Sequence, residues 1–221
     1  MTANELKLDY FQIYDVGNKS AAGEVLLRGQ FDVRRQKMRL ALLDSFANPA
    51  SKNAEPIYDP HAHLTWYVGV QPSEPVRAVI LENQFGRFKI RTGTGHGLLV
   101  PTQKVEQGSR FPDGLDHYKV YRLTDVESVP KGTVKLRDQF GVSEVELQVP
   151  LFFAAPVDKR HRAKAYPVQN GRAHLLIVGI TSRDLEKKII LRNQFEKRTS
   201  VVVVRSVMLA VPSIKHEWKP A

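Results

Sequence analysis

VKLRDQFG (residues 134–141) is an apolar strand candidate that runs into a Gln-Phe pair, and three further segments of the chain follow the same plan. They are VLLRGQFD (25–32), VILENQFG (79–86) and IILRNQFE (189–196). The pairs Gln30-Phe31, Gln84-Phe85, Gln139-Phe140 and Gln194-Phe195 are 54, 55 and 55 residues apart. A regular spacing of this length indicates an internal repeat whose copies fold as similar supersecondary units.

Each copy also has similar flanking segments. Upstream lies an aromatic or apolar strand candidate: LDYFQIYDV (8–16), AHLTWYVGV (62–70), LDHYKVYRL (115–123) and RAHLLIVGI (172–180). Downstream lies a proline with a lysine three residues later: Pro49/Lys52, Pro101/Lys104, Pro156/Lys159 and Pro212/Lys215. The sequence therefore predicts four copies of a unit of about 55 residues.

The copies alternate in type. The first and third begin with Leu-Asp, whereas the second and fourth share Ala-His-Leu. A duplicated two-copy unit of about 110 residues has the size of a compact domain. We therefore expect two tandem β domains, residues 1–112 and 113–221, with the boundary near Phe111–Gly114.

Within the copies, apolar residues recur with a period of two. Val134 and Leu136 alternate with Lys135 and Arg137, and SEVELQV (143–149) alternates in the same way. This period is typical of a strand with one buried face. The expected fold class is all-β, with four repeats of about 55 residues arranged as two pseudo-symmetric β-sandwich or barrel-like domains.

The Gln-Phe pairs and the prolines are interpreted as structural residues of the repeat. A large ring after a strand can close one end of a core, and the glutamine can satisfy backbone groups at the strand end. Gly86 and Gly141, which follow two of the pairs, suit turn positions with positive φ. A binding role for the four glutamines is the alternative.

Composition limits the function classes. Of the 221 residues, 42% are hydrophobic and 25% are charged, which is typical of a globular protein. No apolar run approaches about 18 residues, so no transmembrane segment is expected. The N-terminal stretch MTANELKLDYFQIYDV has no signal-peptide pattern. The absence of cysteine excludes disulfides and thiolate chemistry.

The net charge of +10 suits either solubility or the binding of a polyanion. Positive residues recur just after three of the Gln-Phe pairs, and a further cluster lies in KRHRAK (159–164). The candidate polyanion-binding residues are Arg34, Arg35, Lys37, Arg87, Lys89, Arg91, Lys159, Arg160, Arg162, Lys197 and Arg198. Nucleic acid, anionic lipid or acidic polysaccharide would be the partner.

Signals for catalysis are sparse. His61 and His63 are spaced so that both side chains could face one metal ion from a strand, but a histidine or tyrosine recurs at the second position in every copy. A hydrogen-bonding residue at a strand start is the competing interpretation of His63. No nucleophile motif and no glycosidase-like carboxylate pair is evident. We expect no cofactor and assign no catalytic residue.

The combined pattern H-[Y/L]-x-x-Y, V-x-L-x-x-Q-F-G and A-x-P-V-D-K resembles an uncharacterised β-rich repeat domain found in predicted secreted proteins of myxobacteria and related environmental bacteria. The third copy is the most similar, with LDHYKVYRL, VKLRDQFG and AAPVDK. The resemblance spans all four copies. It implies a β-rich fold and carries no known activity.

The resemblance also implies a departure. Family members usually carry one cysteine in the aromatic strand and another two residues before the proline. The corresponding pairs here are Ile13/Ala47, Trp66/Leu99, Val120/Ala154 and Ile177/Ala210. We predict that apolar packing replaces the crosslinks and that each pair is in contact. The missing cysteines favour a reducing compartment or a hot habitat.

These observations favour a non-enzymatic structural or binding protein that acts through self-assembly or contacts with other chains, as a homo-oligomer or a larger assembly. A polyanion-binding protein is the alternative, and a metal-dependent hydrolase is the third hypothesis. The expected location is the cytoplasm or an assembled particle, with secretion as the possibility that the resemblance implies.

Overall fold

The structure is a computed structural model that describes residues 3–221, with side chains from residue 5 onward. One helical turn, α1 (Ala3–Leu6), precedes twelve strands. The strands are β1 (Tyr10–Arg28), β2 (Gln36–Lys52), β3 (His63–Val70), β4 (Arg77–Asn83), β5 (Gly86–Lys104), β6 (Tyr118–Val126), β7 (Thr133–Asp138), β8 (Gly141–Pro156), β9 (Asp158–His161), β10 (Lys164–Tyr166), β11 (His174–Arg192) and β12 (Thr199–Pro220). The all-β prediction is confirmed. None of the described residues belongs to a helix with the length and hydropathy of a membrane span.

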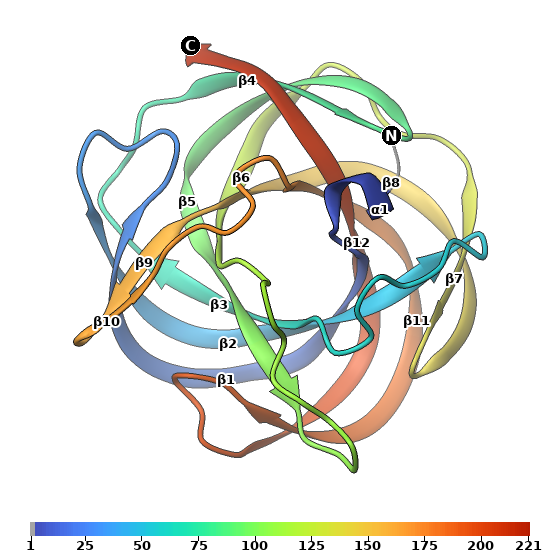
Figure 1. Cartoon of the computed structure of the whole chain (residues 1–221). Coiled ribbons are helices and arrows are strands. Elements are labelled where there is room, and N and C mark those ends of the chain that lie inside the picture. The colour runs from blue at the N-terminus through green and yellow to red at the C-terminus, as the bar shows by residue number, and fades with distance from the viewer. Residues whose placement is uncertain (1–2) are drawn as a thin grey trace.

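Eight of the strands form a closed ring. In order around it they are β1, β2, β3, β5, β6, β8, β11 and β12, each antiparallel to the next, and β12 pairs with β1 to close it. Figure 1 looks along the axis of this ring, with α1 beside one opening. Closure leaves no unpaired edge in the ring.

The segments that precede each Gln-Phe pair form hairpins outside the ring. In each hairpin the residue five positions before the glutamine is paired with the returning strand, as Val25↔Met38, Val79↔Ile90, Val134↔Val145 and Ile189↔Val201. In β1 and β11 a single strand runs from the ring into the hairpin, with register shifts along the way. Such bulges bend a strand and let it change direction.

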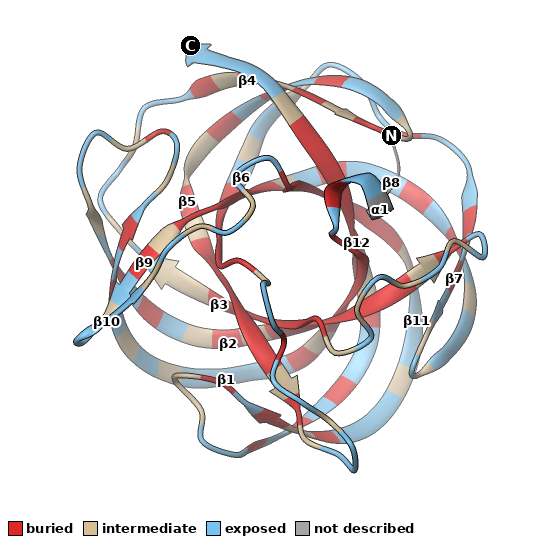
Figure 2. Ribbon diagram, in the orientation of Figure 1, coloured by how far each residue is buried: buried red, intermediate tan, exposed pale blue. Residues whose placement is uncertain are grey.

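The apolar side chains occupy both faces of the ring. One cluster takes residues from all eight ring strands, including Phe11, Trp66, Tyr118 and Ile177, so it fills the interior. Two further clusters lie between the outer face of the ring and the hairpins. Figure 2 shows buried residues on the ring and exposed residues toward the tips of the hairpins.

The four residue pairs that stand where the resembling family carries cysteines are direct neighbours. Each pair occupies opposed positions on adjacent strands, Ile13↔Ala47, Trp66↔Leu99, Val120↔Ala154 and Ile177↔Ala210. All eight residues belong to the interior cluster. The prediction that these pairs meet in the core is confirmed.

The two halves of the chain are not packed separately, which differs from the expected domains 1–112 and 113–221. Strand β5 pairs with β6 across the proposed boundary, and β12 pairs with both β1 and β4. One outer cluster combines Tyr10 and Leu81 of the first half with Tyr121 and Leu209 of the second. The physical reason is that a half ring would expose two strand edges, which the other half covers.

Candidate functional site

The lysine that recurs after each proline lies opposite the leucine that recurs before each Gln-Phe pair. The partners are Lys52↔Leu136, Lys104↔Leu191, Lys159↔Leu27 and Lys215↔Leu81. In every case the leucine belongs to the copy two places further around the ring. The four copies therefore make equivalent pairings although their strands are far apart in sequence.

Each of these lysines also lies over the phenylalanine ring of the following copy. The distances from Nζ to the ring centroid are 5.9 Å for Lys52–Phe85, 5.5 Å for Lys104–Phe140, 5.6 Å for Lys159–Phe195 and 5.3 Å for Lys215–Phe31. An ammonium group at this distance from a ring face is attracted by it. Lys159 is the exception, because burial lowers its pKa to about 6 and it makes this contact mostly as a neutral amine at pH 7. We call this contact the clamp, and it joins every copy to its neighbour, including the fourth to the first.

The glutamines bond to the copy that precedes them, in two ways. Gln30 and Gln139 donate to backbone carbonyls, those of Gly171 (2.6 Å) and Pro60 (3.3 Å). The side-chain amide of Gln84 donates a hydrogen bond to the Tyr10 hydroxyl, and the side-chain amide of Gln194 lies 3.4 Å from His117 Nε2. The alternation follows the odd and even copies that the sequence distinguishes.

The four lysines differ in their electrostatic surroundings. Lys52 and Lys104 pair with Glu55 (2.7 Å) and Glu106 (2.8 Å). Lys159 is fully buried and has no carboxylate partner among the described residues; its Nζ lies 2.7 Å from His117 Nε2. Burial lowers the pKa of Lys159 to about 6. Burial, and then the charge of Lys159, also lower the pKa of His117 well below its ordinary value.

Several of the candidate polyanion-binding residues have acidic neighbours. Lys37 pairs with Glu24 (2.9 Å), and Lys89 pairs with Glu127 (3.1 Å). Further ion pairs join Arg35 to Asp158 (2.8 Å) and Arg91 to Asp125 (3.9 Å). Arg87 is exposed on the β4–β5 hairpin, which it shares with Lys89 and Arg91.

The remaining candidates gather around β9. Arg160 lies opposite Leu26 of the first hairpin, and the His161 ring is 4.9 Å from Phe195 in the fourth copy. We define the basic surface as five exposed residues from these three segments: Arg34, Arg160, Arg162, Lys197 and Arg198. Lys159 must be removed from the candidates, because its side chain is buried beneath Tyr166 and Phe195.

The two histidines considered for a metal lie in different settings. His61 belongs to the turn before β3, and the backbone N–H of His63 donates to the His61 carbonyl (2.9 Å). His63 is the first residue of β3 and is buried, with its ring 5.4 Å from Phe46. Burial lowers the pKa of His63 to about 3. Within residues 3–221, no group of three or more potential ligands is placed to hold a metal ion.

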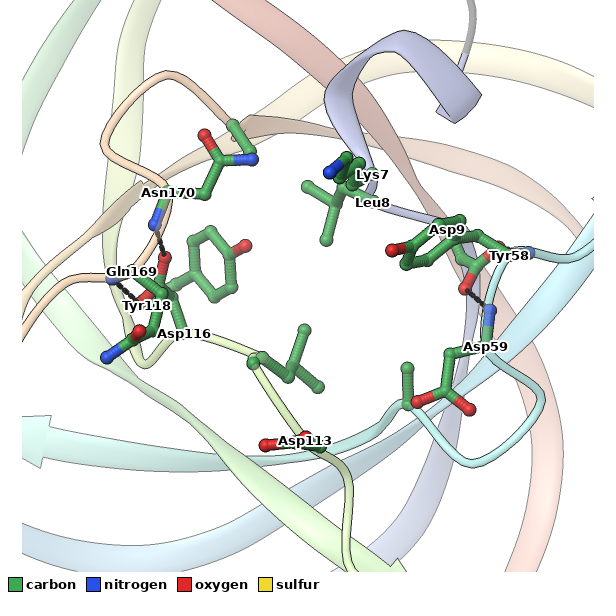
Figure 3. A pocket seen from close by; sticks show the side chains of 14 residues that line it. Lys7, Leu8, Asp9, Tyr58, Asp59, Asp113, Asp116, Tyr118, Gln169 and Asn170 are labelled. Carbon is green, nitrogen blue, oxygen red and sulfur yellow. Dashed lines mark hydrogen bonds between the residues drawn. The ribbon is translucent and has the colours of Figure 1, made fainter.

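A pocket of about 290 Å³ opens at the mouth of the ring, beside the segment that follows α1 (Figure 3). Its walls come from equivalent positions of the two halves. Leu8 corresponds to Leu115, and Asp9 corresponds to Asp116. Asp9 accepts backbone hydrogen bonds from Tyr58 (2.5 Å) and Asp59 (2.9 Å).

The second half repeats this arrangement, because Asp116 accepts from the backbone N–H groups of Gln169 (2.7 Å) and Asn170 (2.8 Å). Burial raises the pKa of Asp9 to about 6 and also raises the pKa of Asp116. The two carboxyl groups therefore fix the loops that form the rim of the pocket.

With this geometry described, comparison with known proteins gives one match. The profile of a family described as a repeat of unknown function (DUF7450) matches residues 63–213. The chain belongs to the DUF7450 family. No curated protein and no solved structure matches significantly. The expectation of an uncharacterised repeat domain is thereby confirmed.

The DUF7450 match runs from the first residue of β3 to Ser213 of β12. Sequence reasoning identified the recurring residues of this DUF7450 chain but missed the pocket, which no motif marks. One signal was present. The aligned copies place Phe11, Leu64, Tyr118 and Leu175 at one position, and only Tyr118 adds a hydroxyl group there.

Proposed function

We propose that the chain is a non-enzymatic β scaffold that acts through contacts with other protein chains, including further copies of itself. The supporting observation is how the recurring side chains are used: the lysines, phenylalanines and glutamines of all four copies make contacts between copies. The recurring residues hold the ring together, so the exposed outer surface of the ring is available to bind other protein chains.

The surface best suited to such contacts lies on the hairpin of β11 and β12. Val202 and Val204 are 42% and 43% exposed. With Leu185 they line an open groove of about 470 Å³ that is bordered by Asp184 and Glu186. An apolar stripe with a charged border is a common feature of protein–protein contacts.

Light scattering of the purified protein over a range of concentrations tests this proposal. We expect the average mass to rise above that of one chain, and to fall back when Val202 and Val204 are both replaced by threonine. Val149→Thr, an exposed valine on β8, is the matched control and should leave the mass unchanged. A wild-type protein that stays monomeric at high concentration would remove this proposal.

A second candidate function is polyanion binding, and the convergence of three separate segments at the basic surface favours it. Five exposed positive side chains on these adjoining segments would attract a phosphate or sulfate backbone and release its counterions. We expect retention on heparin that weakens steeply with salt. The double variant Arg160→Gln/Arg162→Gln should elute at lower salt, whereas Arg87→Gln should elute nearly as the wild type does.

The other expectations stay proposals. Weak retention on heparin at low salt would dismiss polyanion binding, and metal analysis of the purified protein tests the hydrolase hypothesis based on His61 and His63. We also propose a reducing compartment or an assembled particle as the location, with secretion as the alternative that the family resemblance implies; fractionation of the source cells tests both.

A further inference from the structure

The pocket at the ring mouth has an apolar base. Leu8 and Leu115 line it from equivalent positions of the two halves, and so do Ala62 and Ala173. All four belong to, or pack against, the interior cluster of the ring. A cavity of about 290 Å³ with such walls is large enough for a small organic molecule.

Tyr118 supplies a polar group at this base. Its side chain is 1% exposed, and its hydroxyl points into the pocket without a hydrogen-bond partner among the described residues (Figure 3). A hydroxyl that opens into a pocket can both donate and accept a hydrogen bond. A ligand in the pocket would supply the missing partner.

The hydroxyl is not required by the fold. Tyr118 lies opposite Pro156, and the equivalent positions opposite Pro49, Pro101 and Pro212 are held by Phe11, Leu64 and Leu175. Three of the four copies thus carry an apolar side chain at this position. The tyrosine oxygen is an addition specific to the third copy.

The rim of the pocket is acidic although the whole chain carries a net charge of +10. Its lining includes four aspartates, Asp9, Asp59, Asp113 and Asp116. Lys7 is the one lysine or arginine among the lining residues. Asp59 also accepts a hydrogen bond from Arg110 (3.0 Å), whereas Asp113 is exposed at the opening. This charge balance attracts cations and repels anions.

We propose that the ring mouth is a binding site for a small organic ammonium ion with a compact apolar body. The apolar body lies on Leu8 and Leu115, the Tyr118 hydroxyl accepts a hydrogen bond from the ammonium group, and the rim carboxylates provide the opposing charge. This site is separate from the valine groove and from the basic surface, so it can exist whichever surface function holds.

Benzylamine, benzyl alcohol and benzoate are suitable probes because they share one ring and differ in charge. Isothermal titration calorimetry should show benzylamine binding at least about fivefold more tightly than benzyl alcohol, with no binding of benzoate. Equal affinity for all three probes, or binding of none, would overturn the proposal.

Two variants test the residues that carry it. Tyr118→Phe introduces the side chain that the first copy already has, so the fold should be retained, and it should weaken benzylamine binding about threefold to tenfold through the lost hydrogen bond. Asp113→Asn should weaken binding as well. Tyr166→Phe, outside the pocket, is the control and should bind as the wild type does; unchanged affinity in Tyr118→Phe would refute the role of the hydroxyl.

Discussion

At the scale of single residues, Lys159 has the most unusual surroundings. Its pKa is lowered by burial from 10.5 to about 6, so between these pH values the unfolded chain binds one more proton than the folded chain. The free energy of unfolding should therefore rise with pH across this interval and be lowest below pH 6. We expect a change of at least about 1 kcal/mol between pH 6 and pH 9, measured by urea unfolding.

Lys159→Met should flatten this pH profile and raise stability near pH 7, because an apolar side chain of similar length needs no counter-charge. Lys104→Met is the control, since Lys104 pairs with Glu106, and the profile should persist in it. A profile that is unchanged in Lys159→Met would show that other groups cause the pH dependence.

A second residue-scale prediction concerns Gly97 in β5. A methyl group there would overlap the carbonyl oxygen of Tyr67 and lie 2.6 Å from Trp66 Nε1. Gly97→Ala should cost about 2 kcal/mol or more, because backbone leaves no room to adjust. Thermal unfolding measures this loss. Gly171→Ala, where the nearest atom is 3.8 Å away, should change stability by less than about 0.5 kcal/mol.

At the scale of strands, the ladder between β6 and β8 allows a direct test of register. Val120 and Ala154 are opposed residues inside the ring, so Val120→Cys/Ala154→Cys should form a disulfide on oxidation. We expect the oxidised form to be about 2 kcal/mol more stable than the reduced form of the same variant. Mass spectrometry and unfolding under oxidising and reducing conditions measure both effects.

The matched control shifts one cysteine by one position. Ala155 pairs with Lys119 and belongs to an outer cluster, so Val120→Cys/Ala155→Cys places the two sulfur atoms on opposite faces of the sheet. That variant should keep two free thiols. Efficient crosslinking in the control, or none in the test pair, would contradict the register.

The sequence predicts contacts between residues of the same copy better than contacts between different copies. The strands follow from local alternation and from the repeat. The contact of Ile13 with Ala47, which lies within one copy, is implied by the resemblance to a family that carries cysteines at these positions. The partner of Lys52 could not be found in this way: Leu136 lies two copies away, and a period in the sequence does not state which copies meet. The pocket depends on loops from both halves, for the same reason.

At the scale of the whole molecule, the copies close on themselves. The clamp between Lys215 and Phe31 connects the last copy to the first and makes the arrangement cyclic. Ring closure explains why a chain with an obvious two-copy duplication does not fold as two separate domains: the exposed strands of each half are covered by the other half. A substitution that disrupts packing at one point of the ring should therefore lower the free energy of unfolding of the whole ring.

Amide hydrogen exchange of the full-length Gly97→Ala variant tests this closure most directly. The substitution lies in β5 of the first half, where Gly97 pairs directly with Val120 of β6. The amides of the β11–β12 ladder around Ile177 and Ala210 lie in the second half and on strands that do not pair with β5 at this level. The closed ring predicts that the opening free energy of these amides falls by the same amount as the global stability, because the protected core opens as one unit. Unchanged protection in β11 and β12, beside lowered protection in β3, β5 and β6, would contradict it.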